Sequence, residues 1–141
     1  MQSSARNQFA GTVSALNVGV VTDEVQIQTA SGAALVATIT HGSATQLGLK
    51  VGSDVVALVK APSVIIVTDA QGMRFSARNQ LTGTVKSVKT GSVNSEVHLE
   101  ANGLQVVAIV TNDSAQNLGL TAGKSATALF KASQVVLAVK G

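Results

Sequence analysis

Hydrophobic and polar residues alternate along five short stretches of the first half of the chain. These stretches are rich in Val, Thr and Ile, and they cover Phe9–Leu16, Val21–Gln28, Leu35–Thr40, Val55–Lys60 and Val64–Val67. Alternation with a period of two, in residues that favour extended backbone, is typical of half-buried strands. The pattern therefore predicts five short strands, of which the first three form a meander.

The segments between these strands predict turns and one helix. Asn17–Gly19 and Ser31–Gly32 place a glycine where a tight hairpin needs a positive φ. Between the third and fourth strands, Ser43–Leu49 predicts a short helix, with Ser43 as its N-cap and Gly48 at its end. Three strands, a helix and two strands is the order of an OB-type barrel.

The whole pattern occurs twice. Ser4–Gln8 returns unchanged as Ser76–Gln80, and the correspondence continues to the end of the chain after a one-residue deletion near Ser31. Roughly 26 of about 65 aligned positions are identical, which indicates an internal duplication. We therefore predict an all-β fold with one short helix per repeat, built as two tandem OB-like five-stranded barrels. The first domain is predicted at 1–69, the linker at 70–75 and the second domain at 76–141.

Composition restricts the stability and the location of such a chain. It has 141 residues, no cysteine, and Phe9, Phe75 and Phe130 as its only aromatic residues. Repeats of this size without disulfide or metal have marginal cores, so association into an oligomer is expected. Met1–Gln8 contains no apolar signal segment and no run is long enough to span a bilayer, so a cytoplasmic protein without membrane contact is expected.

Catalytic residues are not kept between the repeats. His41 aligns with Asn112 and His98 with Gln26, while Glu24 and Glu96 are the aligned carboxylates. A general acid and base pair, a nucleophile triad or a histidine metal site requires more than this. The sequence thus predicts a protein without enzymatic activity, cofactor or directly bound metal cation.

Hydrogen-bond donors are kept instead. The repeated set comprises Ser4, Arg6, Asn7 and Lys60 with Ser76, Arg78, Asn79 and Lys131, together with the Thr-x-x-Ser pairs Thr40–Ser43 and Thr111–Ser114. Arginine, lysine and hydroxyl donors suit a small, multiply charged oxyanion. With no acidic partner repeated in the motif, the set favours a dianion that only accepts hydrogen bonds. The alternative is structural, with the charges at barrel edges and the hydroxyls as helix caps, and spacing alone does not decide between the two.

These residues resemble the molbindins, which are built from Mop domains. The shared pattern is Ser-Ala-Arg-Asn-Gln, then Gly-Thr-Val, then Thr-x-x-Ser before Leu-Gly-Leu, then Lys-Ala-Ser, and it covers the chain twice. The resemblance implies storage and homeostasis of molybdate or tungstate, bound as an oxyanion between Mop units in a trimer of two-unit chains. The implied oxyanion-binding residues are Ser4, Arg6, Thr40, Ser43, Lys60, Ser76, Arg78, Thr111, Ser114, Lys131 and Ser133.

One position departs from this pattern. Where the second repeat has Ser133 after Lys131, the first has Pro62, which lacks both a hydroxyl and a backbone N–H. The site that uses Lys60 therefore loses two possible donors. We predict two unequal classes of site.

Two other functions fit parts of the sequence. Mop pairs also occur as ligand-sensing modules of transport ATPases and transcription regulators, although these residues contain no Walker A motif or DNA-reading helix. An OB barrel also suggests binding of single-stranded nucleic acid. That function needs aromatic platforms for base stacking, and three phenylalanines supply few of them, so no nucleic-acid partner is expected.

Overall fold

The computed structural model describes residues 1–141 and contains the predicted order of elements in both repeats. The first repeat has β1 (Asn7–Asn17), β2 (Thr22–Thr29), β3 (Ala34–Thr40), α1 (His41–Leu47), β4 (Asp54–Val59), the 3-10 turn η1 (Ala61–Ser63) and β5 (Ile65–Val67). The second has β6 (Asn79–Thr90), β7 (Asn94–Ala101), β8 (Leu104–Thr111), α2 (Asn112–Asn117), β9 (Ser125–Phe130), η2 (Ala132–Gln134) and β10 (Val136–Ala138). Two five-stranded sheets result, which confirms the predicted fold class.

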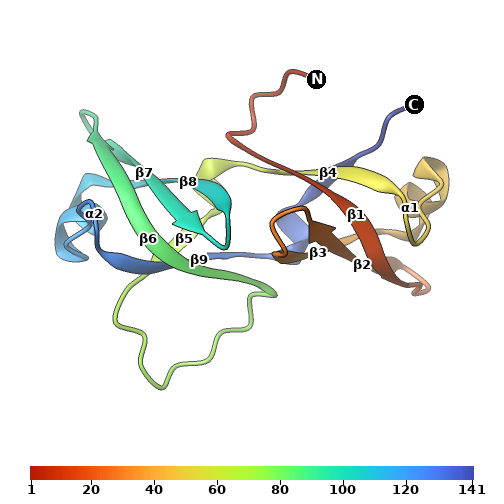
Figure 1. Ribbon diagram of the computed structural model, residues 1–141, viewed down its shortest axis with the longest axis horizontal. Coiled ribbons are helices and arrows are strands. Elements are labelled where there is room, and N and C mark those ends of the chain that lie inside the picture. Colours follow the sequence, from red (N-terminus) through yellow and green to blue (C-terminus); the bar gives the residue numbers. More distant parts are fainter.

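The two sheets exchange their last strands. Their strand orders are β10-β4-β1-β2-β3 and β5-β9-β6-β7-β8, so β10 pairs with β4 and β5 with β9. In Figure 1 the blue C-terminal end of the chain accordingly lies in the lobe formed by β1–β4. The sequence pattern does not predict this exchange, because it assigns five strands to each repeat without indicating which sheet the fifth one joins.

Each sheet curls around a long first strand. β1 pairs with β4 along Asn7–Thr12 and with β2 along Gly11–Asn17, with a bulge at Ser14. A bulge bends a strand and increases its twist, so that one long strand can pair with neighbours on two sides of a barrel. A Cβ on Gly11 would lie 2.6 Å from the backbone oxygen of Gln28. This close approach explains why glycine recurs in the Gly-Thr-Val motif.

One hydrophobic core runs through both repeats. Most of the buried apolar side chains of the two sheets belong to a single cluster. Phe9 of β1 stacks on Phe130 of β9, with ring centroids 6.4 Å apart. The marginal core expected for a repeat of this size is therefore enlarged within the chain itself.

Two buried asparagines join each repeat to the other. Asn7 Nδ2 donates to the carbonyl of Val107 at 2.8 Å, and the amide N–H of Val107 donates to Asn7 Oδ1 at 2.7 Å. Asn79 makes the same two bonds with Val36, both at 2.8 Å. Both asparagines are at most 2% exposed. Their grouping with the oxyanion donors is therefore wrong, because both side-chain amides bond the backbone of the opposite repeat.

The helices begin earlier than predicted. α1 starts at His41 with Thr40 as its N-cap, because Thr40 Oγ1 accepts the amide N–H of Ser43 at 3.1 Å. The prediction of Ser43 as N-cap is thus wrong, since β3 leads directly into the helix. α1 ends as expected at Gly48, with φ of 64°. Neither helix is long and apolar enough to cross a membrane.

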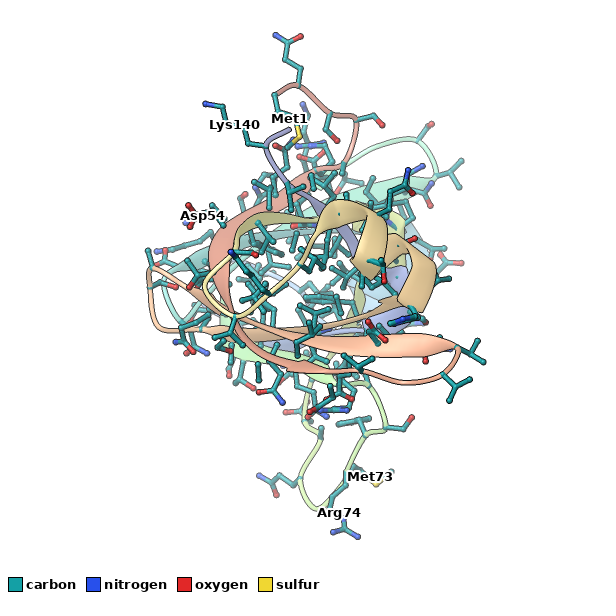
Figure 2. All side chains as sticks on the ribbon, turned by 90° about the vertical axis from the view of Figure 1, so that its right-hand side faces the viewer. Met1, Asp54, Met73, Arg74 and Lys140 are labelled. Atoms are coloured by element: carbon teal, nitrogen blue, oxygen red, sulfur yellow. The ribbon has the colours of Figure 1, made fainter.

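The predicted linker lies outside the two lobes. Figure 2 shows Met73 and Arg74 at the tip of a loop that projects from the body of the protein. Near its start, Asp69 Oδ2 lies 3.8 Å from Lys124 Nζ. The loop connects β5 to β6, so it joins two strands of the same sheet.

We predict that Asn7→Ala destabilises the whole chain. The substitution leaves the buried N–H and C=O of Val107 without partners, which costs about 2 kcal/mol or more. Urea unfolding measures the loss as a lower midpoint. The control Gln8→Ala removes an exposed amide from the same segment and should shift the midpoint little, so equal effects of the two changes would contradict the role given to Asn7.

Candidate functional site

The second repeat brings four of the predicted oxyanion residues together. In the β6–β9 ladder Asn79 pairs with Phe130, so Arg78 and Lys131 lie beside each other just beyond its end. Together with Ser76 and Ser133 they line a groove of about 490 Å³, named here the Arg78 groove. Residues that flank the start of β6 and the end of β9 thus form one cluster of hydrogen-bond donors.

Thr38 of β3 lines the same groove, and the sequence pattern does not single it out. It reaches the groove because η2, which contains Ser133, packs against β3 of the first repeat. Its matching position in the second repeat is Ile109, so comparison of the repeats removes it from the candidates. Only the exchange of the last strands, which brings η2 against β3, places Thr38 at the groove.

The first Thr-x-x-Ser pair adjoins this groove. Thr40 and Ser43 line a neighbouring hollow of about 380 Å³, which shares Thr38 and Ser133 with the Arg78 groove. The Thr40 hydroxyl donates to Ser43 Oγ at 2.7 Å, and both residues are exposed. Donors from both repeats therefore meet at Ser133.

The first repeat has the same arrangement of an arginine beside a lysine, with fewer hydroxyl groups around it. Asn7 pairs with Val59, so Arg6 and Lys60 also lie beside each other at a ladder end, with Ser4 two residues before Arg6. η1 packs against β8 as η2 packs against β3. At the places of Ser133 and Thr38, however, this side has Pro62 and Ile109. The matching pair Thr111–Ser114 caps α2, with a 2.8 Å bond between the two hydroxyls.

Each predicted arginine is paired with a glutamate of the opposite repeat. Arg78 donates to Glu24 Oε2 and Oε1 at 2.7 and 3.1 Å, and Arg6 donates to Glu96 at 2.8 and 2.9 Å. The expectation that the motif has no acidic partner is therefore wrong. Its partners are the two aligned glutamates, which only the fold brings near. Because a guanidinium has five N–H donors, each arginine keeps three for another acceptor.

These contacts keep both carboxylates ionised. The hydrogen bond from Arg78 holds the pKa of Glu24 below its usual range. Arg6, followed by His98, lowers the pKa of Glu96 to about 2. Each arginine and glutamate therefore form a neutral pair at neutral pH. Excess positive charge at the Arg78 groove comes from Lys131.

The remaining polar cluster is structural. His41 is the first residue of α1, and its Nδ1 lies 3.1 Å from the buried carboxylate of Asp23. At the matching place Ser95 Oγ donates to Asn112 Oδ1 at 2.6 Å. No group of three or more His, Cys, Asp or Glu side chains is arranged to hold a metal ion.

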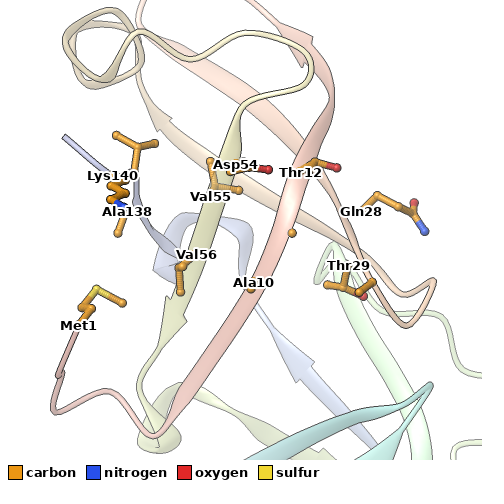
Figure 3. A pocket seen from close by; sticks show the side chains of 13 residues that line it. Met1, Ala10, Thr12, Gln28, Thr29, Asp54, Val55, Val56, Ala138 and Lys140 are labelled. Carbon is orange, nitrogen blue, oxygen red and sulfur yellow. The ribbon is translucent and has the colours of Figure 1, made fainter.

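A hollow larger than these two has a different character. It measures about 720 Å³ and lies on the outer face of β1, β4 and β10, where Met1, Ala10, Val56 and Ala138 line it (Figure 3). Lys140 is the only basic residue on its walls. The Arg78 groove therefore offers a dianion more positive charge and more hydrogen-bond donors than this hollow does.

The fold and these grooves define a tandem OB-like protein with donor clusters at the junction of its repeats. The model of the TOBE domain matches residues 3–66 and again 76–137. The chain belongs to the TOBE domain family and contains two copies of the domain.

Relatives with known names agree with the resemblance to Mop domains, which is confirmed. The chain is 45% identical to the molybdenum transport protein ModE of Herbaspirillum seropedicae, covering 99% of this chain and 52% of that protein. It is 43% identical to the molybdenum-pterin-binding protein MopA of Rhodobacter capsulatus, covering 99% and 53%. The chain thus spans about half the length of these curated relatives.

A solved structure matches over its full length. The cytoplasmic molybdate-binding protein ModG, crystallised with molybdate bound, is 50% identical to this chain and superposes with a TM-score of 0.96. The match covers 99% of this chain and 100% of ModG. The overall fold of this chain is therefore a known architecture.

Proposed function

We propose that this chain binds molybdate, and also tungstate, as an oxyanion at the junctions of its repeats. The observation that carries the proposal is the convergence of Ser76, Arg78, Lys131 and Ser133 on one groove. The full-length likeness to ModG, whose structure holds molybdate, supports the same ligand. The role is storage and homeostasis of molybdenum in the cytoplasm, without catalysis.

The charges of the groove suit a dianion. Lys86 and Lys124 form ion pairs with carboxylates, whereas Lys131 forms none. Its ammonium group therefore remains available as a point charge, while Arg78 contributes N–H donors in a fixed plane. Hydrogen bonds that involve an ionised partner are about twice as strong as neutral ones. Ser76 and Ser133 add neutral donors to the oxygens that the cations do not reach.

The proposal includes a second copy of the chain. Ile65 of β5 and Val136 of β10 occupy matching positions beside the grooves and are 57% and 61% exposed. In the proposed assembly a second chain covers these two side chains. The resemblance to molbindins implies a trimer, in which a Thr-x-x-Ser pair of one chain completes the donor set of another.

A second candidate is that these repeats form the ligand-sensing part of a longer regulator. It is favoured by the ModE relatives, of which this chain matches only 52%. The two candidates share the ligand and differ in the rest of the protein. The mass of the natural gene product separates them, because a store needs only these 14.2 kDa whereas a sensor carries a further domain.

We predict that calorimetric titration detects more than one molybdate per chain, in two affinity classes and with little competition from sulfate. Lys131→Ala should weaken one class roughly tenfold or more, because it removes a charged hydrogen-bond donor. Lys140→Ala removes the same charge from the apolar hollow and should leave both classes unchanged. Absence of heat with the native chain, or equal losses in the two variants, would contradict the proposal.

Pro62→Ser tests why the two classes differ. The change restores a hydroxyl and a backbone N–H to the site that uses Lys60. One added hydrogen bond should strengthen the weaker class by roughly two- to tenfold. The stronger class serves as the internal control, and an unaltered weaker class would show that position 62 does not touch the anion.

A further inference from the structure

The two arginine–glutamate pairs differ in one neighbour. His98 Nε2 lies 2.6 Å from Glu96 Oε1, the same oxygen that receives the N–H of Arg6 at 2.9 Å. At the matching position, two residues after Glu24, the first repeat has Gln26. The glutamate paired with Arg6 thus has a neighbour that can gain a proton, while the glutamate paired with Arg78 has a neutral amide at that position.

The surroundings of His98 contain few other charges. On the adjacent strands, Ser87 of β6 and Val107 of β8 stand opposite it in the ladders. Lys89 of β6 stands opposite Glu96, where the first repeat has Asn17 opposite Glu24. The next charged groups along β6 and β7, Lys86 and Glu100, pair with each other at 3.1 Å. Glu96 is therefore the one carboxylate in contact with His98.

We propose that His98 is a positioning residue that makes oxyanion binding at Arg6 dependent on pH, whereas binding at Arg78 is not. This inference rests on the proposed function. A protonated His98 takes a larger share of the Glu96 carboxylate and leaves more of the Arg6 guanidinium to an anion. It also adds a positive charge near the site.

The sign of the effect follows from charge. Glu96 is ionised throughout the neutral range because Arg6, followed by His98, lowers its pKa to about 2. Histidine side chains change their charge between about pH 5 and 8. Anion binding at Arg6 is therefore coupled to proton uptake, and its affinity rises as the pH falls. The coupling matters most on this side, because Pro62 and Ile109 leave it with fewer hydroxyl donors.

The test is titration with molybdate at pH 6, 7 and 8 and constant ionic strength, in buffers of different ionisation enthalpy. We use the Lys131→Ala chain as the background in which the Arg6 class dominates. Its affinity should rise roughly three- to tenfold from pH 8 to pH 6, with net proton uptake on binding. Adding His98→Gln, which reproduces the residue of the first repeat, should remove both effects.

Two further variants make the result specific. Gln26→His in the otherwise native chain should give the Arg78 class the pH dependence that it lacks. His41→Asn, which places the residue of the second repeat beside Asp23, should leave the pH dependence of the Arg6 class intact. If His41→Asn and not His98→Gln removes the dependence, the assignment is overturned.

The outcomes separate this inference from the proposed function. Binding with the same affinity at all three pH values would overturn the role of His98 and leave molybdate binding standing. Absence of binding by the native chain at every pH would overturn the proposed function and this inference with it. Retention of proton uptake after His98→Gln would place the titrating group elsewhere and overturn the inference alone.

Discussion

The exchange of the last strands is the constraint on which the rest of the structure depends. Because β10 closes the sheet of the first repeat and β5 that of the second, neither sheet is complete without the other half of the chain. The Asn7 and Asn79 bonds and the Phe9–Phe130 stack reinforce the same junction. Small repeats that lack disulfides gain a shared core in this way.

The exchange also assembles the candidate site. η2 immediately precedes β10, so the strand that crosses to the first sheet carries Ser133 onto β3, beside Thr38. Within the repeated polar motif, neighbouring residues then take different tasks. Asn79 is buried and bonds the backbone of Val36, while Arg78 is exposed and meets Glu24. The motif therefore places one residue at the junction and its neighbour at the candidate site.

The sequence predicts the elements well and their partners poorly. Alternation identified the strands, and the positive φ of Gly48 confirms the predicted end of α1. The partner of each fifth strand has no local signal, because β4 and β9 occupy matching places in the two repeats. For this reason the Arg–Glu pairs were missed, although Glu24 and Glu96 were recognised as aligned. Thr38 was missed because a contact made between repeats need not be kept in both.

Disulfide trapping tests the exchange most directly, since the native chain has no cysteine. Ala138 pairs with Val56 across β10 and β4, and both line the hollow of Figure 3. In a chain with a protease site after Gly72, Val56→Cys with Ala138→Cys should hold the cut halves together on a non-reducing gel. Val56→Cys with Val67→Cys, the pair that an unexchanged sheet would bring together, should not form a disulfide. Closure of the second pair and separation of the halves in the first would contradict the exchange.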